Sequence, residues 1–300
     1  MQGAAAVVIA SEENLAAADR GVRRALPDAR RQRRQVAIFL AATQYLVVVG
    51  GLAWLIYRGG AAMQYQWQWA RIPPLVVSVT PTGWAFGPLL LGLVHTLRLA
   101  AIAGALSLIV AVALALGRLS SSWTATKFAA VVVSVARNTP LIVQVSMFYF
   151  VLAPVLGVGR FWSGVASLVL FESAFVSEIV RSGILSVPAG QWEAGAALGL
   201  HQSAVLARVV APQALRTMLP SLTNAAISLI KDTSIVSVIA LFELTTAGRN
   251  AISDTYMSFE IWLTVAAIYL ALTLSLSLLA ARLEKRLTRP FQGHLRTKRT

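Results

Sequence analysis

Long apolar blocks separated by short polar connections dominate the chain. A helix needs about 20 mostly apolar residues to cross the hydrocarbon core of a bilayer, because each residue advances the helix axis by about 1.5 Å. Each block of that length is expected to form one membrane-spanning helix. The pattern therefore predicts an all-α, polytopic membrane bundle of about six transmembrane helices, at 36–57, 91–116, 128–155, 161–184, 215–240 and 261–283.

The composition agrees with a protein whose main solvent is lipid. Hydrophobic residues make up 57% of the chain, charged residues 13%, and the mean hydropathy is +0.70. The absence of cysteine excludes disulfides, a thiolate nucleophile and cysteine metal sites. The net charge of +14 lies in tails and loops beside the apolar blocks, where anionic headgroups explain it, so we expect no nucleic-acid partner.

Basic residues are distributed unequally around the spans, which indicates the orientation of the chain. If the N-terminus is in the cytoplasm, nineteen of the 26 Lys and Arg residues lie on the cytoplasmic side and four on the outer side. The other three lie within spans or at their edges. Both tails are therefore expected in the cytoplasm. The outer set is Arg58, Arg71, Arg160 and Arg249.

The cytoplasmic connection between the fourth and fifth spans is longer than the topology requires. Helix-favouring residues at 191–198 are followed by Gly199, which suits a helix C-cap, so a short surface helix is expected there. A second short helix, about 202–210, is expected to precede Pro212. Taken alone, this pattern would also fit a pair of helices lying on the inner headgroups.

Motifs along the chain resemble a known family. Glu193, Ala194, Gly199 and, after nine residues, Val209 and Pro212 resemble the EAA loop of bacterial ABC importer permeases, with Gly195 in place of the usual second alanine. Together with four further motifs in the same order, they resemble polar amino-acid permeases of the histidine/glutamine/glutamate type over roughly 91–283. These motifs are RNTPLIVQVSMFYF, ESAFVSEIVRSGI, APQALRTMLPSL and SLIKDTSIVSVI.

The resemblance implies a fold of the type I ABC importer permease and a division of the chain. We expect a basic cytoplasmic tail at 1–35, an additional helix with an external loop at 36–90, the permease domain at 91–283 and a basic cytoplasmic tail at 284–300. The loop at 188–212 would dock onto an ATPase subunit. The residues expected to couple the two subunits are Glu193, Ala194, Gly195, Gly199 and Pro212.

The resemblance also implies partners and a location. We expect ATP-binding cassette ATPase subunits, a second permease subunit in a homo- or heterodimer, an external amino-acid-binding protein, and the bacterial inner membrane as surroundings. The chain has no phosphate-binding G-x-x-x-x-G-K-[ST] loop, so ATP would be bound and hydrolysed by the partner and this chain would hold no cofactor. No metal site is expected.

Ionisable residues at membrane depth are expensive and normally face protein or water. Glu178 precedes Arg181 by three residues, which favours an intrahelical or interfacial pair. Lys231 and Asp232 are neighbours and point about 100° apart on a helix, so one of them can face a central cavity. Glu172 interrupts the fourth span and needs a partner of its own.

Pro140 lies inside an apolar stretch, where it removes a backbone donor. Both a packing kink and a polar opening toward the transport cavity remain open. The resemblance places this region, the position of Glu172 and the segment 224–231 around that cavity, with Ala225 where relatives that carry basic amino acids often have Glu. The expected pathway residues are Thr139, Pro140, Leu141, Gln144, Glu172, Asn224, Lys231 and Asp232.

Two other functional classes were weighed against a permease for amino acids. An ion-coupled secondary transporter or channel would need no ATPase, and the 191–199 helix with its spacing argues against it. An intramembrane enzyme could use Glu172 and Asp232 as an acid pair, yet no nucleophile or metal constellation accompanies them, so we expect no catalytic residues.

Overall fold

The computed structural model describes residues 38–55, 57–60, 65–81 and 83–288. The chain divides into two compact units, Met1–Trp67 and Gln68–Thr300, which are described separately. The expected cytoplasmic tail at 1–35 and residues 289–300 of the second tail lie outside the described residues.

The described part of the first unit contains the apolar helix Ile38–Gly60, which confirms the span expected at 36–57. Such a helix is stable in lipid, because its backbone hydrogen bonds are satisfied internally.

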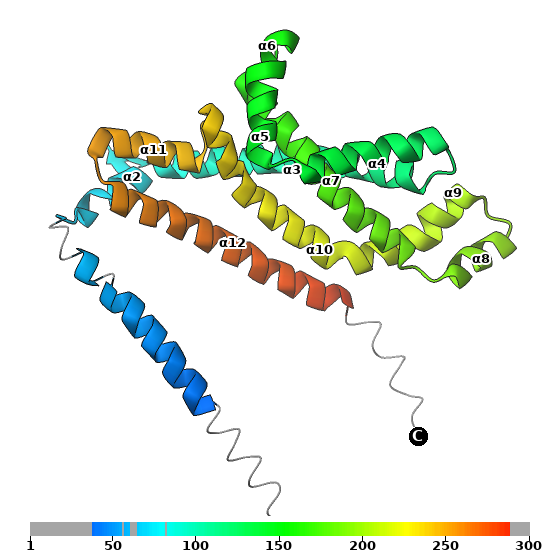
Figure 1. The fold of residues 1–300 in the computed structure, drawn as a ribbon, viewed down its shortest axis with the longest axis horizontal. Coiled ribbons are helices and arrows are strands. Elements are labelled where there is room, and N and C mark those ends of the chain that lie inside the picture. Colours follow the sequence, from blue (N-terminus) through cyan, green and yellow to red (C-terminus); the bar gives the residue numbers. More distant parts are fainter. Residues whose placement is uncertain (1–37, 56, 61–64, 82, 289–300) are drawn as a thin grey trace, which may run out of the picture. The chain divides into compact units, whose positions relative to one another are not determined.

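Four long helices of the second unit confirm four further spans. They are α3 (Pro88–Leu119), α7 (Arg160–Leu185), α10 (Ala211–Asp232) and α12 (Ser258–Thr288). Helix α7 packs along α3 and against α10, and α10 also packs against α12 (Figure 1). Buried apolar side chains from α3, α7 and α10 meet in one core cluster, which includes Leu99, Leu168 and Leu229.

The single helix expected at 128–155 is wrong. Helix α4 (Trp123–Asn138) ends before Pro140, and the chain resumes as α5 (Leu141–Ser146), the π-helical η2 (Met147–Leu152) and α6 (Ala153–Leu156), bent by 105° from α4 (Figure 1). Thr139 takes the extended conformation that a following proline favours, with φ −107° and ψ 129°. The proline therefore breaks the helix completely.

The connection between α7 and α10 forms α8 (Ala189–Ala197), which confirms the first short helix expected there, and then α9 (Gln202–Val205). The second expected helix does not stop before Pro212. Helix α9 continues through the π-helical turn η3 (Leu206–Val210) into α10, where Pro212 occupies the first turn. The expectation failed because proline is tolerated in a first helical turn, and here a π-turn leads into it.

The remaining described elements are short. They are the 3₁₀ turns η1 (Trp69–Arg71) and η4 (Thr233–Ile239), the helices α2 (Pro73–Val76) and α11 (Leu244–Thr255), and a hairpin of β1 (Val77–Thr80) and β2 (Gly83–Phe86). The strands pair antiparallel, with Val77 opposite Phe86. The buried carboxylate of Glu260 in α12 accepts a hydrogen bond from the backbone N–H of Gln68 at 2.7 Å, which ties η1 to the bundle.

Candidate functional site

Glu172 lies at the centre of α7 and lines a cavity of about 180 Å³. The cavity walls come from α3, α7 and α10, and they are mostly apolar, with Ser107 and Ala225 among them. The Glu172 residue is only 5% exposed. A single carboxyl group in an apolar cavity is the type of polar contact that orients a small ligand.

The carboxyl group of Glu172 has no hydrogen bond or ion pair with any other described residue. The charge of Asp232, at the end of α10, acts on Glu172, and it is of the same sign as the Glu172 carboxylate. Asp232 in turn is next to Lys231, whose charge acts on it. Neither Lys231 nor Asp232 is among the residues that line the Glu172 cavity, and no described cation pairs with Glu172.

One face of α10 is polar over its whole length. Its members recur every three or four residues, so they share a side of the helix. All are exposed except Ser228, which is half-buried, and Lys231 forms no ion pair with a described residue outside its own helix. The face consists of Gln213, Thr217, Ser221, Asn224, Ser228 and Lys231.

The break at Pro140 is held by the side chain of Gln144. Its amide Nε2 donates to the carbonyl oxygens of Ala136 at 2.8 Å and Thr139 at 3.0 Å, at the end of α4. Both acceptors have lost their helical partners, because the chain turns away after Asn138. The Gln144 amide thus stabilises the bend. Its own Oε1 is buried without a hydrogen bond among the described atoms.

The other pathway candidates near the break have packing roles in this structure. Leu141 is buried in the core cluster of α3, α7 and α10. Thr139 is half-buried, and its hydroxyl donates to the carbonyl of Val135. They lie at the bend and are not among the residues lining the Glu172 cavity.

Helix α8, in the connection between α7 and α10, has one packed face and one open face. Gly195 is buried, and Trp192 packs on the cluster that contains Val205 and Val210. Glu193 and Ala194 are exposed, as is Leu198, which is 79% exposed. Pro212 is exposed at the start of α10. The open face is available for another protein.

Two glycines shape this connection. A Cβ atom at Gly195 would lie 2.8 Å from both methyl carbons of Val205, so only glycine allows this approach of α8 to α9. Gly199 has φ +72°, and the N–H of Leu200 reaches back to the carbonyl of Gly195 at 3.2 Å. This left-handed C-cap with its reaching bond is the Schellman arrangement, as expected for Gly199.

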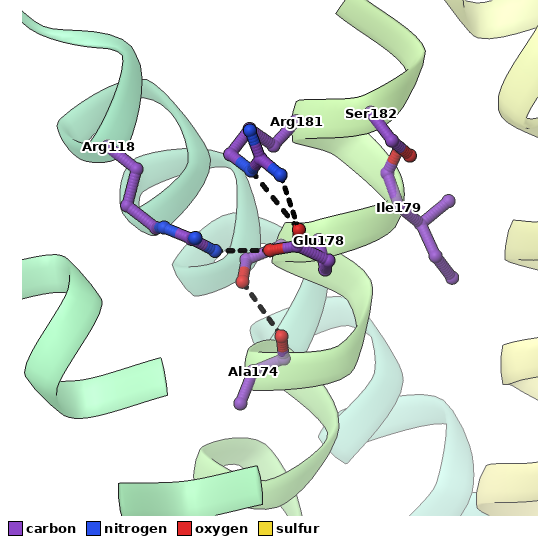
Figure 2. Close-up of polar contacts among 7 residues, drawn as sticks. Arg118, Ala174, Glu178, Ile179, Arg181 and Ser182 are labelled. Atoms are coloured by element: carbon purple, nitrogen blue, oxygen red, sulfur yellow. Dashed lines mark hydrogen bonds and ion pairs between the residues drawn. The ribbon is translucent and has the colours of Figure 1, made fainter. Parts of the chain in front are cut away.

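The expected pair of Glu178 and Arg181 is present and has a third member. Arg181 Nη2 lies 2.5 Å from Glu178 Oε1, while Arg118 at the end of α3 binds the other carboxylate oxygen (Figure 2). The cluster therefore joins α3 to α7 just before the connection that carries α8. Sequence reasoning missed Arg118 because 60 residues separate it from Glu178.

A second buried carboxylate was also missed. Glu243 has no exposed surface and caps α11, accepting hydrogen bonds from the backbone N–H groups of Thr245 at 2.8 Å and Thr246 at 2.6 Å and from the Tyr269 hydroxyl at 3.0 Å. Burial raises the pKa of this carboxyl group, and the hydrogen bonds oppose the rise. Its acceptors are satisfied, which makes it a structural cap.

Nothing in the described part of the chain forms a cluster of three or more metal-ligating side chains. His95 stacks edge-on against Phe242, with ring centroids 5.2 Å apart. His201 caps α9 by accepting from the N–H of Ser203. Both histidines have local structural roles.

Comparison with known proteins places this geometry in context. Residues 106–289 match the family described as binding-protein-dependent transport system inner membrane component. The glutamine transport system permease protein GlnP of Escherichia coli K12 is 37% identical over 230 residues, which cover 75% of this chain and 99% of that protein. The octopine transport system permease protein OccM of Rhizobium radiobacter is 36% identical over 209 residues, covering 66% and 85%.

Solved structures show the same fold. An amino acid ABC transporter crystallised with histidines superposes with a TM-score of 0.62 at 35% identity and covers 66% of this chain and 94% of its own. The MetNI methionine ABC transporter in an inward-facing conformation gives a TM-score of 0.58 at 19% identity, which supports the fold alone.

Proposed function

The chain belongs to the family of binding-protein-dependent transport system inner membrane components, and we propose that it carries polar L-amino acids through the membrane as the permease subunit of an ABC importer. The family and the relatives make it a multi-pass inner-membrane permease of the amino-acid ABC type. The ion-coupled alternative is not favoured. The names of the glutamine and octopine permeases support the cargo class.

The observation that carries the proposal is the unpaired carboxyl group of Glu172 in its cavity. An amino acid brings an α-ammonium group, which is the cation that this carboxylate lacks. A charge-assisted hydrogen bond between them would compensate the cost of keeping Glu172 ionised at membrane depth. Asp232, which lies near Glu172, would add to the negative field that attracts the ammonium group.

The opposite end of the cargo requires donors or a cation. Lys231 and Asn224 lie on the polar face of α10, where an ammonium group and an amide can receive the α-carboxylate. Ala225 lines the Glu172 cavity, so no acidic side chain comes from that position to hold a basic cargo. This arrangement favours cargo with a neutral polar side chain.

Coupling to ATP hydrolysis is assigned to α8 and its flanks. The open face with Glu193 and Ala194 would contact an ATP-binding cassette subunit, and Gly195, Gly199 and Pro212 would fix the shape of the connection. Closure of two ATPase subunits would then move α8 and rock the helices as rigid bodies. A second permease subunit and an external binding protein complete the proposed assembly.

The proposed orientation puts both tails and α8 in the cytoplasm. Its support is the excess of Lys and Arg around the ends of the spans on that side. The Ile38–Gly60 helix would then cross the membrane outward, and the hairpin of β1 and β2 would lie outside.

The substitution Lys231→Met tests recognition of the cargo. It removes a charge that addresses the backbone of every amino acid, so uptake of each cargo should fall about tenfold or more in kcat/KM, in keeping with the loss of a charged hydrogen bond. The measurement is uptake into proteoliposomes that also contain the ATPase subunits and the binding protein, normalised to the amount of assembled complex.

Lys127→Met is the matched control, because Lys127 is an exposed lysine in the first turns of α4, outside the proposed pathway. A purely structural role for Lys231 predicts less folded protein and recovery in the double variant with Asp232→Asn. Uptake at the wild-type rate by a well-assembled Lys231→Met permease would rule out the role of this lysine in cargo recognition.

A further inference from the structure

A second cavity, of about 400 Å³, lies between α3, α4 and α7, with different lining residues from the Glu172 cavity. Its walls include two arginines, Arg118 and Arg137, together with the polar side chains of Ser134 and Asn138. In contrast to the apolar Glu172 cavity, this one is lined mainly by polar groups. No expectation from the sequence included it.

The charges around this cavity do not balance. Three arginines accompany one carboxylate: Arg118 and Arg137 line the cavity together with Glu178, and Arg181, which does not line it, pairs with Glu178. Both oxygens of Glu178 are already taken, one by Arg118 and the other by Arg181 (Figure 2). Glu178 therefore has no free oxygen in this arrangement for the third arginine.

Arg137 is the arginine without an acceptor. Its guanidinium lies 5.3 Å from the centre of the Phe175 ring, and it forms no hydrogen bond or ion pair with any described residue. The neighbouring Asn138 uses its amide to donate to the carbonyl of Ser134 at 2.7 Å. Arg137 thus offers the donors of a planar guanidinium to the cavity while the aromatic ring supports one of its faces.

We propose that this cavity binds one oxyanion group, a carboxylate or a phosphate, through Arg137 with Ser134 beside it. A guanidinium binds both groups through two parallel hydrogen bonds, which a lysine could not reproduce. The bound anion would supply the negative charge that Arg137 lacks among the described residues. Arg137 and Ser134 are both exposed, so an anion can reach the guanidinium from the surface of the protein.

Two sources of this group are present around a membrane permease. One is the α-carboxylate of the cargo on its way from the Glu172 cavity to the cytoplasm. The other is the phosphate of an anionic phospholipid, whose chains could lie on the exposed apolar residues of α4, Phe128, Val131 and Val135. The cargo source rests on the proposed transport of amino acids, and the lipid source does not.

Arg137→Gln in the complete complex tests the inference. The complex is reconstituted with its ATPase subunits and binding protein in phosphatidylcholine, with and without phosphatidylglycerol, and both L-glutamine uptake and ATPase activity are measured. Arg137→Lys keeps the positive charge but loses the paired donors of the guanidinium. Arg249→Gln, at an exposed arginine of α11, is the matched control.

For a cargo carboxylate, Arg137→Gln raises the KM for L-glutamine about tenfold in both lipid mixtures, equal to about 1.4 kcal/mol. For a lipid phosphate, phosphatidylglycerol stimulates the ATPase activity of the wild type, and Arg137→Gln loses that response with an unchanged KM. In either case Arg137→Lys has an intermediate effect and Arg249→Gln has none.

Wild-type KM and wild-type lipid response in Arg137→Gln would overturn the inference. So would a loss of assembled complex as the variant's only defect, since Arg137 would then hold subunits together. If the wild-type complex takes up no amino acid at all, the proposed function fails, while the lipid response of the ATPase still decides on the anion site.

Discussion

A glutamate in the middle of α7 and a glutamate near its C-terminal end have opposite surroundings. Glu178 has an arginine on each carboxylate oxygen, one from α3 and one from its own helix. Glu172, six residues earlier on α7, is more deeply buried and has a second acid nearby in place of a cation. From burial alone, the paired arginines would be expected at Glu172, because a more deeply buried carboxylate is more costly to leave without a cation.

Under the proposed function, the difference separates a structural charge from one that handles a ligand. The Glu178 cluster satisfies itself within the protein and makes a joint between α3 and α7 where the chain leaves for α8. The charge of Glu172 would be left for a group that arrives from outside. Substitutions at the two ends of the helix should therefore separate stability from transport.

Glu172→Gln should have the largest effect. It keeps the shape of the side chain and removes the charge, so uptake should fall about 10- to 100-fold, the loss expected for a charge-assisted hydrogen bond. Thermal stability of the purified complex should stay the same or rise slightly, because the repulsion with Asp232 disappears. A marked loss of stability with normal uptake per assembled complex would make Glu172 a structural residue and remove the contrast.

Glu178→Gln should show the reverse pattern. It leaves Arg118 and Arg181 facing each other without a carboxylate, which we expect to cost about 1–3 kcal/mol, since the three side chains are only partly shielded from water. The midpoint of thermal unfolding should fall, while uptake per assembled complex changes little. Adding Arg118→Gln should recover part of the lost stability. If the losses of the two single variants simply add up in the double variant, Glu178 and Arg118 do not stabilise the contact between α3 and α7 together.

Gly195→Ala tests the packing of α8, which follows the Glu178 cluster along the chain, and it should have the smallest effect. The new methyl group would lie 2.8 Å from the methyl carbons of Val205 and push α8 away from α9, at a cost of about 1 kcal/mol. ATPase activity should respond less to loaded binding protein, while cargo affinity stays unchanged. Val205→Ala makes room and should restore the response; failure to do so would show that the contact does not fix α8.

Features that depend on neighbours in the sequence could be predicted. The five continuous spans followed from the length of apolar runs, α8 and its left-handed cap at Gly199 from residue type and spacing, and the Glu178–Arg181 pair from the three-residue separation. In each case the physical cause acts within one or two helical turns.

Features that depend on contacts between distant parts of the chain could not be predicted from the sequence. Arg118 reaches Glu178 across 60 positions, and no spacing rule connects them. Sequence reasoning kept Pro140 inside one span and ended a helix before Pro212, yet the chain breaks at Pro140 and stays helical through Pro212. The preceding turn decides between them, since Thr139 is extended whereas the π-turn η3 leads smoothly into α10.

The break at Pro140 also bears on how the chain enters the membrane during its synthesis. By hydropathy, residues 128–155 leave the ribosome as one apolar stretch, and α5 with six residues and α6 with four are too short to form independently. The 105° bend becomes favourable only when Leu141 meets α7 and η4 and the Gln144 amide reaches the freed carbonyls. We therefore expect this segment to insert first as a provisional straight helix and to acquire its bend after α10 and η4 have been made.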